Sequence, residues 1–115
     1  MEVVSVTVGV PVTDLAAAVE WYRRVLELPE PDLEPADGVV EFKVGKVWLQ
    51  LWQDASPRGG DVVVRLGVPD VDRQWARLRA LGVAVGPVEH VPGAVDYVDF
   101  VDPDGNRLSL YTERG

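Results

Sequence analysis

The stretch Asp102-Pro103-Asp104-Gly105-Asn106 decides how the C-terminal part of this chain folds. It lies between the apolar run 98–101 and the alternating run 107–111. Proline fixes one backbone dihedral, glycine permits a positive φ, and aspartate and asparagine side chains bond to nearby backbone amides. Such a segment between two strand-forming runs predicts a tight turn. We therefore expect a hairpin that closes a sheet.

The first half of the chain predicts a strand, a helix and three further strands. Alternating valines indicate the first strand, and apolar residues at helical spacing indicate a helix capped by Thr13 or Asp14. Prolines then leave room only for a short edge strand before a hairpin around Gly45-Lys46. The predicted elements cover residues 3–10, 15–26, 32–34, 39–44 and 47–53.

The second half repeats this order after a linker at residues 55–60, which is rich in proline, glycine and serine. Asp70 begins the second helix and Gly82 ends it. His90 precedes Val91-Pro92-Gly93, so we expect it in an exposed loop, solvated rather than catalytic. The predicted strands cover residues 62–68, 84–90, 97–101 and 107–111.

The two halves align as an internal duplication. Asp14 and Asp70, which begin the two helices, lie 56 residues apart. The same offset aligns Phe42 with Val98, and it should grow by three residues in the last strand because the second hairpin loop is longer. Gln50 then corresponds to Ser109. We expect a single domain built from repeat units at about 1–54 and 61–115.

The duplicated unit and the strand, Asp-Pro-Asp-Gly-Asn, strand pattern resemble the vicinal-oxygen-chelate superfamily of glyoxalases, bleomycin-resistance proteins and extradiol dioxygenases. The resemblance implies an α+β fold in which two tandem βαβββ units form curled mixed sheets around a concave cavity, with the helices outside. A ferredoxin-like two-layer fold is the alternative, since its elements alternate in a similar way.

Composition limits the partners. At 115 residues the chain is near the size at which a second subunit often completes the structure, so we expect a homodimer. Its net charge of −8 disfavours nucleic acid and indicates either an acidic cleft for a cationic compound or simply solubility. No long apolar segment or signal sequence is visible, which predicts a cytoplasmic protein without membrane contact. The absence of cysteine excludes disulfides and thiolate ligands.

The resemblance implies metal ligands at Thr7, Gln50, Val63 and Ser109. Divalent metals prefer imidazole nitrogens and carboxylate oxygens, which threonine, valine and serine do not offer. We therefore predict no metal and no cofactor. The alternative is a weak site in which Glu41 and Asp99 assist Gln50.

Strand alternation predicts which side chains share the concave face. Aromatic walls with a few polar groups are typical of small-molecule pockets, although these aromatics could instead fill a core or a dimer interface. The arginines could bind a carboxylate or phenolate, or could pair with the acidic residues. The predicted ligand-binding residues are Thr7, Glu41, Trp48, Gln50, Trp52, Arg65, Tyr97, Asp99, Arg107, Ser109 and Tyr111.

These residues predict a metal-free protein that sequesters a small aromatic or cationic compound. No nucleophile and base stand at a diagnostic spacing. The alternative is an enzyme of the same superfamily, a lyase, isomerase or dioxygenase, acting on a small oxygenated metabolite.

Overall fold

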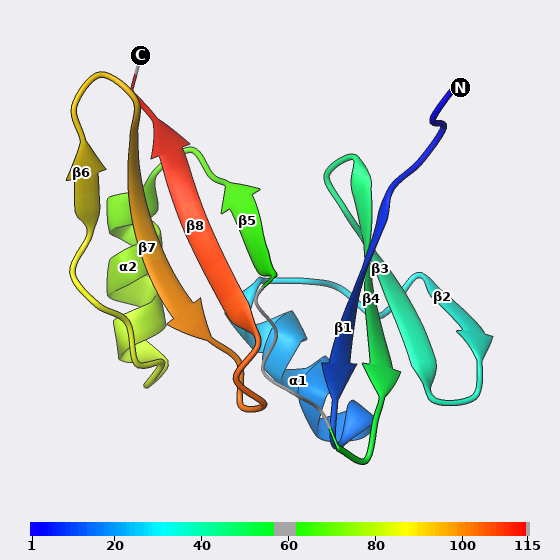
Figure 1. Ribbon diagram of the computed structural model, residues 1–115. Coiled ribbons are helices and arrows are strands. Elements are labelled where there is room, and N and C mark those ends of the chain that lie inside the picture. The colour runs from blue at the N-terminus through cyan, green and yellow to red at the C-terminus, as the bar shows by residue number, and fades with distance from the viewer. Residues whose placement is uncertain (57–61, 115) are drawn as a thin grey trace. The chain divides into compact units, whose positions relative to one another are not determined.

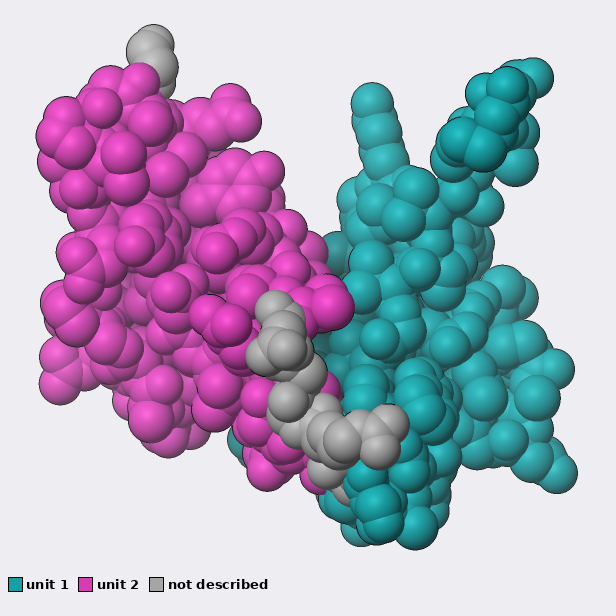
Figure 2. Space-filling view, viewed as in Figure 1, with its two compact units in different colours: residues 1–58 teal, residues 59–115 magenta. Residues whose placement is uncertain are grey.

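The chain forms two compact units, residues 1–58 and 59–115 (Figure 2). The computed structural model describes residues 1–56 and 62–114. Part of the predicted linker at 55–60 therefore lies outside the described residues. Each unit contains one helix and one four-stranded mixed sheet (Figure 1), which confirms the predicted α+β fold with two βαβββ units.

In the first unit the strands lie in the order β1-β4-β3-β2. Strands β1 and β4 are parallel, and the other neighbours are antiparallel. Helix α1 connects β1 to β2 and contacts β4. The bounds of the elements are β1 Thr7–Val12, α1 Leu15–Val25, β2 Leu33–Ala36, β3 Val39–Val44 and β4 Val47–Gln53.

The second unit has the equivalent order β5-β8-β7-β6, again with its first and last strands parallel. Helix α2 contacts β7 and β8. The bounds are β5 Val63–Gly67, α2 Val71–Ala80, β6 Glu89–Val91, β7 Val95–Val101 and β8 Arg107–Glu113.

Both helices begin at the predicted aspartates. The side chain of Asp14 accepts a hydrogen bond from Ala17 N at 3.1 Å, and that of Asp70 accepts one from Arg73 N at 3.2 Å. These carboxylates satisfy amides that have no partner inside the helix. Each helix buries an apolar face, with Tyr22 and Val25 in α1 and Leu78 in α2.

The first residue of each helix is also tied to the last strand of its unit. Leu15 N donates to Gln53 Oε1 at 3.3 Å, and Val71 N donates to Thr112 Oγ1 at 2.9 Å. The Thr112 hydroxyl in turn donates to Val68 O at 2.8 Å. The same helix-to-strand contact therefore recurs at equivalent positions in both halves of the duplication.

One face of each sheet is apolar and lies against the helix of its unit. Alternate residues of the strands on this face are buried, as expected for a sheet covered on one side. The opposite face is left for polar and aromatic side chains. The buried apolar strand residues are Val10, Val12, Val40, Phe42, Leu49, Leu51, Val98, Phe100, Leu108 and Leu110.

Strand pairing confirms the predicted hairpin registers but corrects one alignment of the repeat. Phe42 lies opposite Leu49, and Val101 lies opposite Arg107, as predicted. The residue equivalent to Leu49 is Leu108, and Leu108 lies opposite Phe100. Phe42 therefore corresponds to Phe100 rather than Val98, because the chain has two more residues from Asp70 to Phe100 than from Asp14 to Phe42.

Several predicted strand boundaries were wrong: β2 ends at Ala36, β7 begins at Val95 and β8 ends at Glu113, and the largest differences are in β1 and β6. Strand β1 begins at Thr7 because β4, its only neighbour, pairs Thr7 with Trp48 and offers no partners to residues 1–5. It continues through Pro11, which an edge strand tolerates. The predicted strand 84–90 is reduced to β6, Glu89–Val91, so His90 lies in an edge strand and not in a loop.

The Asp102–Asn106 turn is held together by a buried carboxylate. Asp102 is 3% exposed, and its Oδ1 accepts hydrogen bonds from Asp104 N at 2.9 Å and Asn106 N at 2.8 Å. Its Oδ2 accepts from Asn106 Nδ2 at 2.8 Å. Gly105 has a φ of 85°, a conformation that favours glycine. The turn therefore depends on the residue types that predicted it.

Replacing Asp102 should destabilise the protein. Asp102→Ala leaves buried donors without an acceptor, and we expect it to lower the free energy of unfolding by about 2–4 kcal/mol. Urea denaturation measures this loss. Asp37→Ala, in the exposed turn before Gly38, is the control and should change stability by less than about 0.5 kcal/mol. Equal effects of the two substitutions would contradict this role for Asp102.

Candidate functional site

The face of the first sheet opposite α1 carries five of the predicted ligand-binding residues. Gly9, Gln50 and Glu41 lie side by side on neighbouring strands. Gln50 Nε2 donates to Glu41 Oε2 at 2.8 Å, which fixes the amide, and a Cβ added at Gly9 would stand 3.3 Å from its Oε1. Thr7 and Trp48 form the next row, and Trp52 lies two residues beyond Gln50.

The two tryptophans on this face differ in accessibility. Lys43 Nζ lies 4.9 Å from the centre of the Trp48 ring, so a cation already covers that ring. Trp52 is 36% exposed, and its Nε1 lies above Gly9, where a side chain's Cβ would stand 3.5 Å from it. Trp52 is therefore the aromatic surface of this sheet that remains open to a ligand.

The equivalent face of the second sheet is built around an arginine. Arg65, Ser109 and Asp99 lie side by side on β5, β8 and β7. Arg65 Nη1 lies 3.2 Å from Ser109 Oγ, to which it donates, and 3.8 Å from Asp99 Oδ1. The predicted pairing between an arginine and an acidic residue is thus present at this position.

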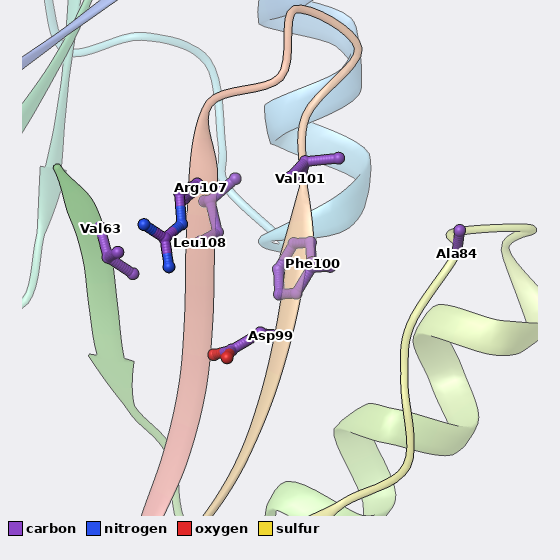
Figure 3. A pocket seen from close by; sticks show the side chains of 7 residues that line it. All are labelled: Val63, Ala84, Asp99, Phe100, Val101, Arg107 and Leu108. Atoms are coloured by element: carbon purple, nitrogen blue, oxygen red, sulfur yellow. The ribbon is translucent and has the colours of Figure 1, made fainter. Parts of the chain in front are cut away.

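The next row of this face lines a cavity of about 260 Å³. Val63 and Val101 lie on either side of Arg107 in the sheet. Figure 3 shows the Arg107 guanidinium on the side of Val63, and the Asp99 carboxylate directed from β7 toward β8. Sequence reasoning predicted two of the lining residues, Asp99 and Arg107, and missed the other five, which are ordinary apolar core, strand or loop positions. The lining is Val63, Ala84, Asp99, Phe100, Val101, Arg107 and Leu108.

The remaining predicted residues, Tyr97 and Tyr111, lie opposite each other on β7 and β8. A Cβ added at Gly67 would stand 3.1 Å from Tyr111 Oη, so the ring occupies the space that a side chain at position 67 would need. Tyr111 also lines a second depression of about 420 Å³ at the ends of β5 and β8, together with Pro69 and Glu113.

The positions that the resemblance assigned to metal ligands do not fit a divalent ion. Ser109 Oγ already accepts from the Arg65 guanidinium, whose positive charge would repel a metal ion beside it. Gln50 is the only amide among the four positions, and its Nε2 is bound to Glu41. Within residues 1–56 and 62–114, no group of three or more His, Asp or Glu residues could hold a metal ion.

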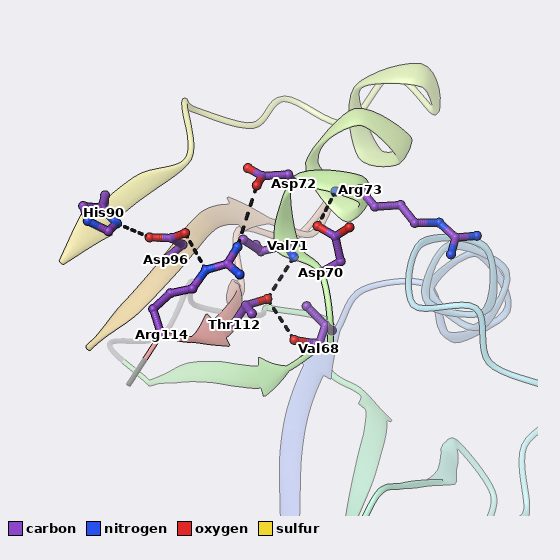
Figure 4. Close-up of polar contacts among 9 residues, drawn as sticks. All are labelled: Val68, Asp70, Val71, Asp72, Arg73, His90, Asp96, Thr112 and Arg114. Atoms are coloured by element: carbon purple, nitrogen blue, oxygen red, sulfur yellow. Dashed lines mark hydrogen bonds and ion pairs between the residues drawn. The ribbon is translucent and has the colours of Figure 1, made fainter. Parts of the chain in front are cut away.

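His90 belongs to an ion-pair cluster away from these rows of residues. Its Nδ1 contacts Asp96 Oδ1, and Arg114 Nε donates to Asp96 Oδ2 at 2.9 Å (Figure 4). Arg114 also lies 3.8 Å from Asp72 of α2. His90 is exposed, as predicted, but it is paired with a carboxylate rather than only solvated.

The comparisons with known proteins agree with this fold. A family model described as the Glyoxalase/Bleomycin resistance protein/Dioxygenase superfamily matches residues 4–110. The chain therefore belongs to this superfamily. No match was found among curated protein sequences.

Solved structures with the same fold include proteins of different activities. An antibiotic binding protein from a Streptomyces species is 28% identical, with 99% of each chain covered and a TM-score of 0.82. A lactoylglutathione lyase from Agrobacterium tumefaciens is 26% identical, with 93% of this chain and 91% of that chain covered and a TM-score of 0.77. A glyoxalase/bleomycin resistance protein from Catenulispora acidiphila is 25% identical, with 96% and 98% covered and a TM-score of 0.77.

No helix within the described residues has the length and apolar character needed to cross a membrane.

The Asp96 cluster predicts a pH-dependent contribution to stability. Hydrogen bonds from His90 and Arg114 hold the pKa of Asp96 below its ordinary value of 3.8. Because the pKa is lower in the folded state, the carboxylate stabilises the fold above its unfolded pKa, and this contribution is lost as the pH falls through the folded pKa.

Asp96→Asn should therefore lower the urea midpoint near pH ~7 and lower it less near pH ~2.5, below the unfolded pKa of Asp96, where the contribution of the ionised carboxylate declines. Urea denaturation at the two pH values measures the difference. Asp37→Asn is the control, and it should show no comparable pH dependence. An equal effect of Asp96→Asn at both pH values would count against the ion-pair contribution.

Proposed function

We propose that this chain is a metal-independent small-molecule binding protein that sequesters its ligand on the sheet faces opposite the helices. The observation that carries the proposal is the exposed Trp52 indole beside the Gln50 amide, which Glu41 holds in place. An aromatic surface with a fixed polar group is the usual composition of a small-molecule site. The proposed mechanism is stoichiometric capture, with stacking on Trp52 and orientation by polar groups of the same face.

The relatives support binding as a function of this superfamily. The antibiotic binding protein from Streptomyces aligns with this chain over nearly the full length of both. We propose an aromatic ligand for the present chain on the basis of Trp52, and a homodimer in the cytoplasm as its working form. The ligand-binding residues predicted from the sequence remain the proposed contacts.

A metal-dependent enzyme is the second candidate. The lactoylglutathione lyase from Agrobacterium shows that the superfamily includes lyases. The contact between Gln50 and Glu41 at 2.8 Å brings together two oxygen-bearing side chains, which is the observation in favour of residual metal binding. The two candidates differ in whether a divalent ion is retained.

Metal uptake should be absent. After anaerobic incubation with ferrous, nickel or zinc ions and thorough desalting, mass spectrometry should find less than about 0.1 equivalent per chain, a rough cut for a specific site. Glu41→Gln should give the same value. If the unsubstituted chain retains about one equivalent of metal and Glu41→Gln does not, metal independence is refuted and the enzyme is favoured.

Ligand capture should depend on the Trp52 ring. The probes are aromatic acids, amines and amides, each in a one-ring and a two-ring form, and their binding is measured by calorimetric titration. Trp52→Ala should weaken two-ring compounds by about 1–3 kcal/mol if the ring stacks on them. Trp52→Phe retains an aromatic face and should lose much less binding free energy for the same compounds. Unchanged affinity in Trp52→Ala would refute stacking, and failure of every compound to bind would refute the proposed function.

A further inference from the structure

The duplicated sheets carry different charges at equivalent positions. Register places Arg65 where the first unit has Gly9, since both lie beside the equivalent pair Ser109 and Gln50. Arg107 likewise stands where the first unit has Trp48. The second sheet therefore has two arginines at positions that are neutral in the first.

Only one of these arginines is neutralised by its neighbours. Arg65 lies 3.8 Å from Asp99, and both side chains are about half exposed. Arg107 has no ion-pair partner among residues 1–56 and 62–114. With Arg65 and Asp99 offsetting each other, the Arg107 guanidinium leaves a local positive charge at its end of the face, six residues along β8 from Glu113, in a chain whose net charge is −8.

The cavity beside Arg107 combines this charge with apolar walls. Asp99 is the other charged residue of the lining, and the remaining lining residues are apolar. Figure 3 shows Val101 and Phe100 on β7 near the two charged groups. The volume of about 260 Å³ lies below the ~300–1,000 Å³ that is usual for drug-sized ligands. The cavity therefore suits a small, partly apolar compound such as a single-ring molecule.

We propose that the cavity of the second sheet binds a small organic anion, with a carboxylate held by Arg107 and an apolar body against Val63 and Val101. A guanidinium matches a carboxylate with two parallel hydrogen bonds, which a cationic ligand cannot form. A cation would also be repelled by the Arg107 guanidinium. The inference rests on the proposed binding function and replaces the cationic ligand suggested by net charge with an anionic one.

The test compares benzoate, benzamide and benzylammonium, which share one ring and differ in charge. Calorimetric titration of the whole chain at low salt should give saturable binding of benzoate and at least ~10-fold weaker binding of the other two compounds. Arg107→Gln should weaken benzoate ~10- to 100-fold, because it removes the charge-assisted hydrogen bonds. Arg73→Gln is the matched control: it removes one exposed positive charge of α2 and should change benzoate affinity less than ~2-fold.

The outcomes separate the inference from the function on which it rests. If benzamide or benzylammonium binds as tightly as benzoate, or if Arg107→Gln and Arg73→Gln act alike, the anion site is refuted while small-molecule binding stands. If neither these compounds nor the two-ring set binds, the proposed function fails and the inference fails with it. Circular dichroism of both variants confirms that any loss of binding is not a loss of fold.

Discussion

The parallel pairing of the first and last strands of each unit is the constraint on which the rest of the structure depends. A parallel neighbour requires the chain to cross over the sheet, and the helix makes that crossing. The crossing is fixed where it begins, because Gln53 in one unit and Thr112 in the other accept a hydrogen bond from the first helical amide. The position of each helix determines which sheet face is buried and which is free.

The free faces of the two sheets carry different side chains at equivalent positions of the same backbone arrangement. The central row of the first sheet contains Gly9, Gln50 and Glu41, and that of the second contains Arg65, Ser109 and Asp99. A glycine allows Gln50 and Trp52 to lie close to the sheet, whereas an arginine covers the serine beside it. Because backbone pairing is the same in both units, these substitutions change the surface without changing the core.

These substitutions are also the reason why we propose a metal-independent function for this member of the superfamily. The fold places four side chains where metal ligands are expected, but Thr7 and Val63 supply neither an imidazole nor a carboxylate. Ser109 is engaged by a guanidinium, and Gln50 is engaged by Glu41. Function on this fold therefore has to be argued from the residues present on the sheets.

The sequence by itself determined the fold class, both helix starts, the hairpin registers and the alternation of faces, because turn residues, helix caps and apolar periodicity act over a few residues. The length of β6, the place of His90 and the equivalence of Phe42 with Phe100 were decided by tertiary structure, because they depend on which strand partners are available. Tertiary structure also decided that Arg65 pairs with Asp99 while Arg107 lines a cavity. Alternation assigns a side chain to a face, but the neighbours it meets there come from strands far apart in the sequence.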